Sequence, residues 1–390
     1  MPITAPPSWL VDDDYDVDAF RELVARTTHS SDVPHATMIE QNVPIYDGPG
    51  LHDIARDPVR RKALIGEVAW ALGKGPGVVA FQRGLNDADN RLADATAVFQ
   101  EIIGEQHATG RAVGDHFATP GSNDRVWNSH EKLAQHAPEV FVAYYSADAI
   151  SIGCEAWLGP HYQVSAQVNR VNPGGTAQSP HRDYHVGFYP PEEMDRFPRH
   201  VHLMSQALTL QGAVAHTDMP LESGPTMLLP FSQLCHGGFI AALRDDFRDV
   251  FHEHKVQLPL RAGDVVFFNP AVMHGAGANV TTDFQRMANL LQVSSAFGRT
   301  METMDPDITA LAAYPFLADI ADARACENVI AAACEGYAFP TNLDNDPPIG
   351  GLAPPSQADV VRQAVADGWT LEQVRESFAA RNARRAGLTP

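Results

Sequence analysis

The sequence is poor in cysteine and contains no long apolar run. Its four cysteines, Cys154, Cys235, Cys326 and Cys334, are spread widely and form no CxxC pair. In a chain of 390 residues they predict buried thiols in a reducing compartment. No run approaches the roughly 18 apolar residues of a membrane-spanning helix. The acidic, Pro-rich start MPITAPPSWLVDDDYD does not have the form of an export signal. We therefore expect a cytoplasmic protein.

Positive charge is also scarce. Lys and Arg total 28 against 48 Asp and Glu, which gives a formal net charge of −20. Nucleic acids and anionic membrane surfaces are bound through clustered Lys and Arg, so this balance argues against both kinds of partner. It favours a neutral or cationic small molecule over an acyl-CoA as the substrate.

Helical periodicity dominates the sequence before residue 160. Apolar residues recur at helical spacing in PVRRKALIGEVAWALGKG and again in NDADNRLADATAVFQEII, where Asn86 or Asp87 is a candidate N-cap. The segment between them, GVVAFQRG, predicts a short strand. Residues 138–159 have the length and spacing of a single buried helix. Residues 1–55 show no motif, so we expect an irregular N-terminal segment there.

From about residue 161 to 298 the pattern changes to short β-rich runs. These runs are HYQVSAQVNRV, HLMSQALTLQGAVAH, PTMLLP, GDVVFFNP and MANLLQVSSAF, with Gly and Pro between them. This pattern is typical of a sandwich or jelly roll. Residues 301–390 form a third part, in which 341–355 resembles a linker. Two helices should follow it, one starting at Ser356 and one at Thr370, where TLEQ has capping-box form.

The stretch SPHRDYHVGFY contains candidate metal ligands. On a strand, His181 and Asp183 point to the same side. An iron site of the oxygenase type needs two imidazoles and one carboxylate, with the remaining positions open. His274, which follows the buried strand VVFF and precedes two glycines, is a candidate third ligand. Arg286 opens the next strand, and a buried guanidinium needs a partner such as a bound dicarboxylate.

Ordinary structural roles compete with these assignments. A single histidine is more often a hydrogen-bonded structural residue, and the second HxD triplet, His216-Thr217-Asp218, is interpreted as a loop. His252 and His254 receive the same interpretation, as does His185, although His185 lies near enough to touch a substrate. The order of the candidates is more informative than any one of them: His274 comes 93 residues after His181, and Arg286 comes 12 residues later.

Four stretches resemble the phytanoyl-CoA dioxygenase family of iron(II)- and 2-oxoglutarate-dependent oxygenases. They are GVVAFQRGLNDADNRL, SPHRDYHVGF, ESGPTMLLPFSQ and RAGDVVFFNPAVMHGAGAN with FQRMANLLQVSSA. The resemblance implies a mainly β fold, with a double-stranded β-helix (jelly-roll, cupin-like) core and flanking helices. We expect the oxygenase domain to span residues 56–300, between the N-terminal segment 1–55 and a helical extension, 301–390.

The resemblance also implies the roles of individual residues. His181, Asp183 and His274 match the iron ligands, and Arg286 matches the arginine that holds the distal carboxylate of 2-oxoglutarate. The implied reaction uses O2, converts 2-oxoglutarate to succinate and CO2, and hydroxylates a small molecule. Asp183 favours hydroxylation over halogenation, while desaturation and cyclisation remain open. Alternation along QVSAQVNRV places Gln167 in the cofactor-binding wall, together with Asn169.

Three positions depart from the family pattern. Gln233 stands where a histidine is common, Ala276 replaces a small hydroxyl residue, and one extra residue separates His274 from Arg286, so that Gln285 occupies the expected place. We assign the extra residue to the NVTTD loop. Residues 189–200 are a candidate lid or a surface connection. A non-redox metal-binding jelly roll (an isomerase or ligand-binding barrel) is the alternative function, and an inactive scaffold is a third.

Overall fold

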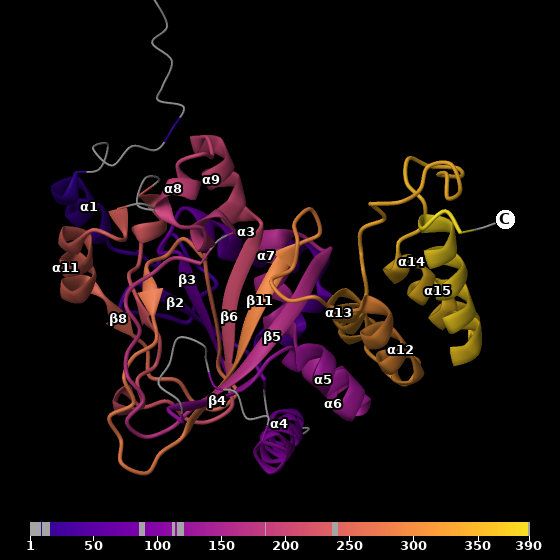
Figure 1. Cartoon of the computed structure of the whole chain (residues 1–390), viewed down its shortest axis with the longest axis horizontal. Helices are drawn as coiled ribbons and strands as arrows, with labels where there is room; N and C mark the ends of the chain where they lie inside the picture. Colours follow the sequence, from indigo (N-terminus) through magenta and orange to yellow (C-terminus); the bar gives the residue numbers. More distant parts are fainter. Residues whose placement is uncertain are drawn as a thin grey trace, which may run out of the picture.

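Two facing β-sheets form the centre of the protein (Figure 1). The computed structural model describes residues 9, 16–85, 90–110, 114, 121–183, 185–235 and 241–388. The larger sheet has the strand order β1-β2-β3-β9-β6-β11-β5-β4, and the smaller has the order β10-β7-β8. The strands are β1 Met38–Glu40, β2 Val43–Asp47, β3 Val78–Gln82, β4 Asn123–Val126, β5 Tyr162–Val171, β6 Thr209–Ala215, β7 Met227–Leu228, β8 Val256–Gln257, β9 Val265–Phe268, β10 His274–Gly275 and β11 Arg286–Ser295.

From β5 to β11 the chain passes back and forth between the two sheets. It runs from β5 in the larger sheet to His181, which forms an isolated antiparallel bridge with His274 of β10, and then to β6 in the larger sheet. Strands β7 and β8 lie in the smaller sheet, β9 in the larger, β10 in the smaller and β11 in the larger. This alternation is the double-stranded β-helix that the sequence predicted.

The two faces of the larger sheet have different neighbours. Along β11, Met287, Leu291 and Val293 join the apolar core shared with the helices. Alternate residues of the same strand, beginning with Arg286 and Ala288, face the smaller sheet, because successive side chains of a strand point to opposite sides. The inner face therefore carries the residues available for a site.

Helices hold more residues than the strands do, and several of them cover the outer face of the larger sheet. They are α1 Val17–Val24, α2 Leu51–Arg56, α3 Pro58–Gly73, α4 Arg91–Ala108, α5 Ser129–His136, α6 Pro138–Tyr145, α7 Asp148–Leu158, α8 Pro191–Met194, α9 Arg199–Ala207, α11 Asp245–His254, α12 Pro306–Leu317, α13 Ala323–Ala333, α14 Gln357–Asp367 and α15 Leu371–Arg385. None of the described helices is long and apolar enough to serve as a bilayer span.

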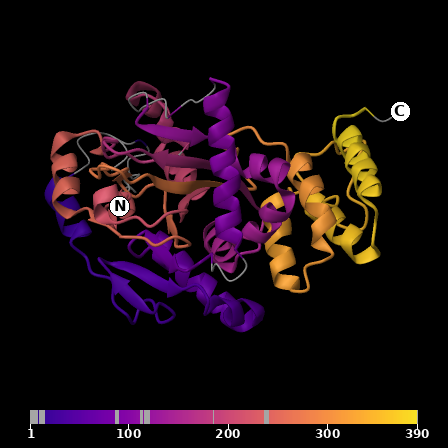
Figure 2. The same cartoon turned by 90° about the horizontal axis from the view of Figure 1, so that it is seen from below.

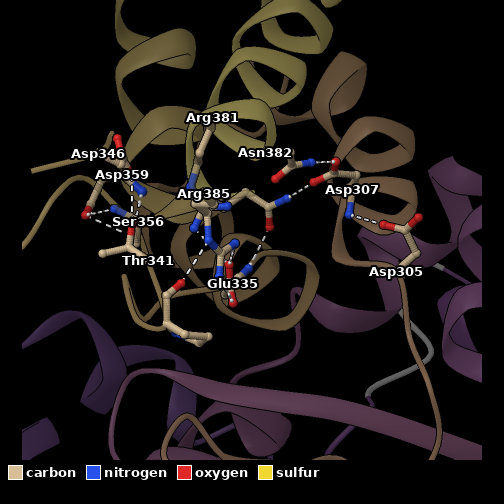
Figure 3. A network of polar contacts seen from close by, with 12 residues as sticks. Asp305, Asp307, Glu335, Thr341, Asp346, Ser356, Asp359, Arg381, Asn382 and Arg385 are labelled. Atoms are coloured by element: carbon tan, nitrogen blue, oxygen red, sulfur yellow. Dashed lines mark hydrogen bonds and ion pairs between the residues drawn. The ribbon is translucent and has the colours of Figure 1, made fainter. Parts of the chain in front are cut away.

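The C-terminal helices α14 and α15 gather at one end of the molecule, far from α1 and α11 (Figures 1 and 2). The capping boxes predicted at Ser356 and Thr370 are both present. Polar contacts join these helices to α12 and α13 (Figure 3). The Glu335 carboxylate accepts hydrogen bonds from Arg381 and Arg385, each at 2.8 Å. No helix or strand lies within 341–355, as expected of a linker.

Three secondary-structure expectations were wrong. Residues 1–55 were expected to be irregular, but their described part contains α1, β1, β2 and most of α2, and β2 pairs with β3. Strands as short as β1 and β2 show no periodicity in the sequence, which is why they were missed. Residues 138–159 form two helices, because the Ser146 hydroxyl donates to the Ala143 carbonyl at the end of α6 and a new helix begins at Asp148.

The third error concerns residues 202–216. The run starting at 202 was expected to be β throughout, but α9 occupies its first half, since Pro198 precedes a helix with one buried face. The segment 189–200, a candidate lid or surface connection, contains α8 and the start of α9. The candidate cap at Asn86 or Asp87 lies outside the described residues.

Candidate metal and cosubstrate site

His181, Asp183 and His274 come together at one edge of the smaller sheet. Backbone hydrogen bonds hold all three residues in place. His181 and His274 exchange two of them, of 2.9 and 3.0 Å, and the Asp183 N–H donates to the Pro270 carbonyl at 3.0 Å. The Asp183 Oδ2 atom lies 3.7 Å from His181 Nε2 and 3.6 Å from His274 Nε2. Among the described residues, these three form the only cluster of His, Cys, Asp or Glu side chains suited to hold a metal ion.

Each imidazole is oriented by its own chain. Nδ1 of His181 lies 2.8 Å from the Ser179 carbonyl, and Nδ1 of His274 lies 2.8 Å from the Val272 carbonyl. A carbonyl only accepts, so Nδ1 carries the proton and the lone pair is at Nε2, as in metal-binding histidines. Two such nitrogens and one carboxylate are the donor set of non-haem iron(II) enzymes. His181, Asp183 and His274 therefore provide the donor set that iron(II) requires.

Asp183 is ionised in this setting. Burial alone would raise its pKa, but in the metal-free protein the His274 and His181 imidazoles in their protonated form and a hydrogen bond from Gln211 outweigh burial and lower the pKa to about 2. The Gln211 amide donates to Asp183 Oδ2 at 2.7 Å. The sequence prediction missed Gln211, and its one signal was an amide within the otherwise apolar run TLQGAVA.

Arg286 lies at the wall of a cavity between the two sheets. The cavity has a volume of about 50 Å³ and is lined mainly by apolar side chains, among them Leu228 of β7 and Val266 and Phe268 of β9. Two of the lining residues also contact a metal ligand: the ring of Phe268 packs against His274, with centroids 4.7 Å apart, and Leu228 pairs with His274 across β7 and β10.

The guanidinium of Arg286 is buried, with 7% of the residue exposed. Its Nη1 donates to the Ser223 carbonyl at 3.2 Å, and no ion pair joins it to any acidic residue in the described chain. Burial lowers its pKa to about 10, so it remains a cation at neutral pH. Asn169 lines the same cavity, and its buried Oδ1 has no hydrogen-bond partner in the described structure.

The structure also places the other residues that the sequence offered for the cosubstrate site, Gln285, Gln167 and Asn169. Gln285 is exposed and donates to Asn172, so Arg286 rather than Gln285 faces the cavity. Gln167 lies on the inner face, as predicted, but its amide oxygen accepts a hydrogen bond from Arg125 at 3.2 Å. Of the two residues from this strand, Asn169 rather than Gln167 lines the cavity.

The departures from the family pattern have structural counterparts. The Gln233 amide donates to the Gly75 carbonyl at 2.8 Å, which ties the PFSQ turn to the end of α3. The backbone N–H of Ala276 donates to the Gln178 side chain at 3.0 Å.

The second HxD triplet is structural. His216 is buried between the Thr96 hydroxyl and the Tyr144 hydroxyl, and burial lowers its pKa to about 3. Asp218 accepts a hydrogen bond from the backbone of Ala262. All four cysteines are free thiols, two of them buried and two half-buried.

A double-stranded β-helix that carries this metal cluster and a buried arginine on its inner face is typical of the class of iron- and 2-oxoglutarate-dependent enzymes. Residues 72–288, more than half of the chain, match the family model for phytanoyl-CoA dioxygenase. The chain belongs to this family. Iron(II) is therefore its metal, and 2-oxoglutarate and O2 are its cosubstrates.

The chain is also similar to solved structures. The α-ketoglutarate-dependent epimerase SnoN from nogalamycin biosynthesis is 22% identical, covering 62% of this chain and 84% of its own, with a TM-score of 0.41. The carbocyclase SnoK, from the same biosynthesis, is 23% identical over 59% of this chain and 83% of its own (TM-score 0.41). AviO1 from Streptomyces viridochromogenes is 19% identical over 54% and 87% (TM-score 0.39). No curated protein matches the chain.

Proposed function

We propose that this protein hydroxylates a small molecule. One O2 and one 2-oxoglutarate are consumed for each C–H bond converted to C–OH, and succinate and CO2 are released. The observation that supports this proposal is the buried Arg286 guanidinium, which lines a cavity whose Phe268 also contacts His274 and which has no acidic partner in the described chain. Since leaving a buried charge unpaired is costly, the site requires an anion, and the distal carboxylate of 2-oxoglutarate supplies one.

The chain's own residues divide the work. His181, Asp183 and His274 hold the metal, and bound iron(II) supplies the open coordination positions and the redox chemistry that joins decarboxylation to oxygen insertion. Arg286 binds the far carboxylate through its planar fork, and Asn169 lies beside it on the neighbouring strand. The apolar walls exclude water from the cosubstrate and strengthen this ion pair. Binding a five-carbon diacid requires the lining side chains to move apart, because the cavity is about 50 Å³.

The test is an anaerobic titration of the iron(II) protein with 2-oxoglutarate, in which the visible metal-to-ligand charge-transfer band reports chelation. We expect a saturable band. In Arg286→Ala, removal of the buried cation should weaken 2-oxoglutarate binding by about 100-fold, as expected for a truncated buried charge pair.

Gln285→Ala is the matched control, because Gln285 precedes Arg286 but is exposed. It should bind 2-oxoglutarate as the unaltered protein does. A metal-loaded protein that shows no band would favour the non-redox metal-binding barrel instead, whereas a band with equal affinities in the two variants would contradict the role given to Arg286.

A further inference from the structure

The inner face of the larger sheet continues past the metal ligands, away from Arg286. Strands β6 and β11 are antiparallel, and Gln211 lies opposite Gln292, while Thr209 lies opposite Ser294. On β5, Ser165 lies opposite Gln292 from the other side. We call these five residues the distal row.

The distal row shares the cavity's side of the sheet. Ala213 and Leu290 line the cavity, and the row continues from them at two-residue intervals along the same strands. Gln211 of the row donates to Asp183, so the metal cluster lies at the boundary between the cavity and the row.

Several polar atoms of the row are buried without a partner. Thr209 Oγ1, Ser294 Oγ and Gln211 Oε1 have no hydrogen bond in the described structure, and these residues are 5%, 0% and 4% exposed. Leaving one such group unpaired costs about 1–3 kcal/mol. Three together on one face, next to a metal cluster, indicate a surface built to receive hydrogen bonds from a ligand.

His185 lies at the same end of the sheet. Its Nε2 is also buried without a partner among the described residues. A Cβ added at Gly298 would lie 3.8 Å from this nitrogen and 3.4 Å from Leu208, the residue before Thr209. The imidazole is therefore close to the end of the row where Thr209 and Ser294 lie.

The row has a definite chemistry. Its hydroxyls and amides both donate and accept hydrogen bonds, and none of its five members carries a charge. Such a set complements hydroxyl groups and offers nothing to the phosphates of an acyl-CoA, which require Lys or Arg. Sites that hydrogen-bond a substrate hydroxyl also reject analogues lacking it, because their own polar groups are then left unpaired.

We propose that the distal row binds a neutral, polyhydroxylated substrate, such as a sugar or cyclitol unit, and presents one of its C–H bonds to the metal. This inference rests on the proposed function, since it assigns the substrate class of the same site.

The test uses the anaerobic iron(II)–2-oxoglutarate complex, whose charge-transfer band changes when a substrate displaces water near the metal. The probes are myo-inositol and methyl α-D-glucopyranoside, compared with decanoate and decanoyl-CoA. We expect the polyhydroxylated probes to shift the band and to stimulate succinate formation when O2 is admitted. The decanoyl compounds should do neither.

Two variants connect this response to the row. Thr209→Val and Ser294→Ala each remove one hydroxyl with little change of shape, and each should weaken the probe response by about 10-fold. Thr341→Val makes the same chemical change in the C-terminal extension, where the hydroxyl contacts Asp346, and should not alter the response. Titration with 2-oxoglutarate alone comes first for every variant, as the check on folding and metal loading.

The outcomes separate the two proposals. Without a band from 2-oxoglutarate alone, the proposed function itself fails. With a normal band, the substrate class is wrong if neither polyhydroxylated probe changes it, if decanoyl-CoA changes it instead, or if the response survives in both row variants. The last result would mean that Thr209 and Ser294 bind ordered water only.

Discussion

The two ends of the inner face use the same strands for different kinds of recognition. At one end, the cavity places a single buried cation, Arg286, among apolar walls. At the other end, the distal row presents neutral hydroxyls and amides. A single charge in an apolar cavity binds one anionic group strongly. Several neutral groups bind through many weaker hydrogen bonds, whose sum depends on how well a ligand matches them.

This contrast fits a division between cosubstrate and substrate. The cosubstrate is common to the family, and one charge with fixed geometry is enough to hold it. A substrate must be distinguished from similar molecules, and unpaired neutral groups do this by penalising any ligand that leaves them unsatisfied. The metal cluster, held between the two ends by Gln211, is where the two ligands would meet.

The largest effect is expected from replacing a metal ligand, since the metal cluster lies at the boundary between the cavity and the distal row. His274→Ala removes one of three ligands, so iron(II) affinity should fall by more than about 100-fold, as loss of a first ligand exceeds the 10–100-fold cost of losing its supporting contacts. Metal content after dialysis measures this change. His252→Ala, which alters an exposed histidine of α11, should keep its iron, and equal losses in both variants would argue against the assigned cluster.

Arg286→Lys tests whether the cavity end recognises charge alone or a planar fork. Lysine keeps the positive charge but loses the bidentate geometry. We expect 2-oxoglutarate to bind roughly 20-fold more weakly, which corresponds to one lost charge-assisted hydrogen bond. The charge-transfer titration measures it. Unchanged affinity would mean that the carboxylate meets the cation without a paired hydrogen-bond geometry.

The sequence predicted the charged end far better than the neutral end. His181, Asp183, His274 and Arg286 are informative because their residue types are costly to bury and appear in a fixed order. The structure brings the first three together and places the arginine at the cavity. Gln285 shows the limit of spacing arguments, since it holds the expected position but points to solvent.

The neutral end could not be found in the same way. Serine and threonine are ordinary in strands, and only the register of β6 against β11 sets Thr209 opposite Ser294. That register depends on tertiary pairing between segments about 80 residues apart. The helix α9 was missed for a related reason, because a short apolar run fits a buried helix as well as a strand.

Gln211→Leu tests whether Gln211 supports the metal cluster at the boundary between the two ends. The substitution removes the hydrogen bond to Asp183 Oδ2 and replaces the amide with an apolar side chain of similar size. Contacts that orient metal ligands are typically worth 10–100-fold in metal affinity, and we expect roughly 10-fold here, measured by iron(II) titration. The same change in Gln163, whose amide contacts Ser295 and Gly298 carbonyls, should leave metal affinity unaltered.

The smallest predicted effect concerns the stability of the fold and arises away from both ends of the inner face, at the buried imidazole of His216. Burial lowers the pKa of His216 to about 3, so the folded protein keeps this imidazole neutral where the unfolded chain takes up a proton. Its contribution to stability is therefore present at neutral pH and is lost as pH falls below the unfolded pKa of about 6.5. Between pH 7 and 5.5 the loss should be about 1 kcal/mol. Urea unfolding at both pH values measures it, and His216→Gln should remove that part of the pH dependence. If the variant keeps the full dependence, the proton is taken up elsewhere, with His130, whose pKa burial lowers to about 4, as the next buried imidazole to replace.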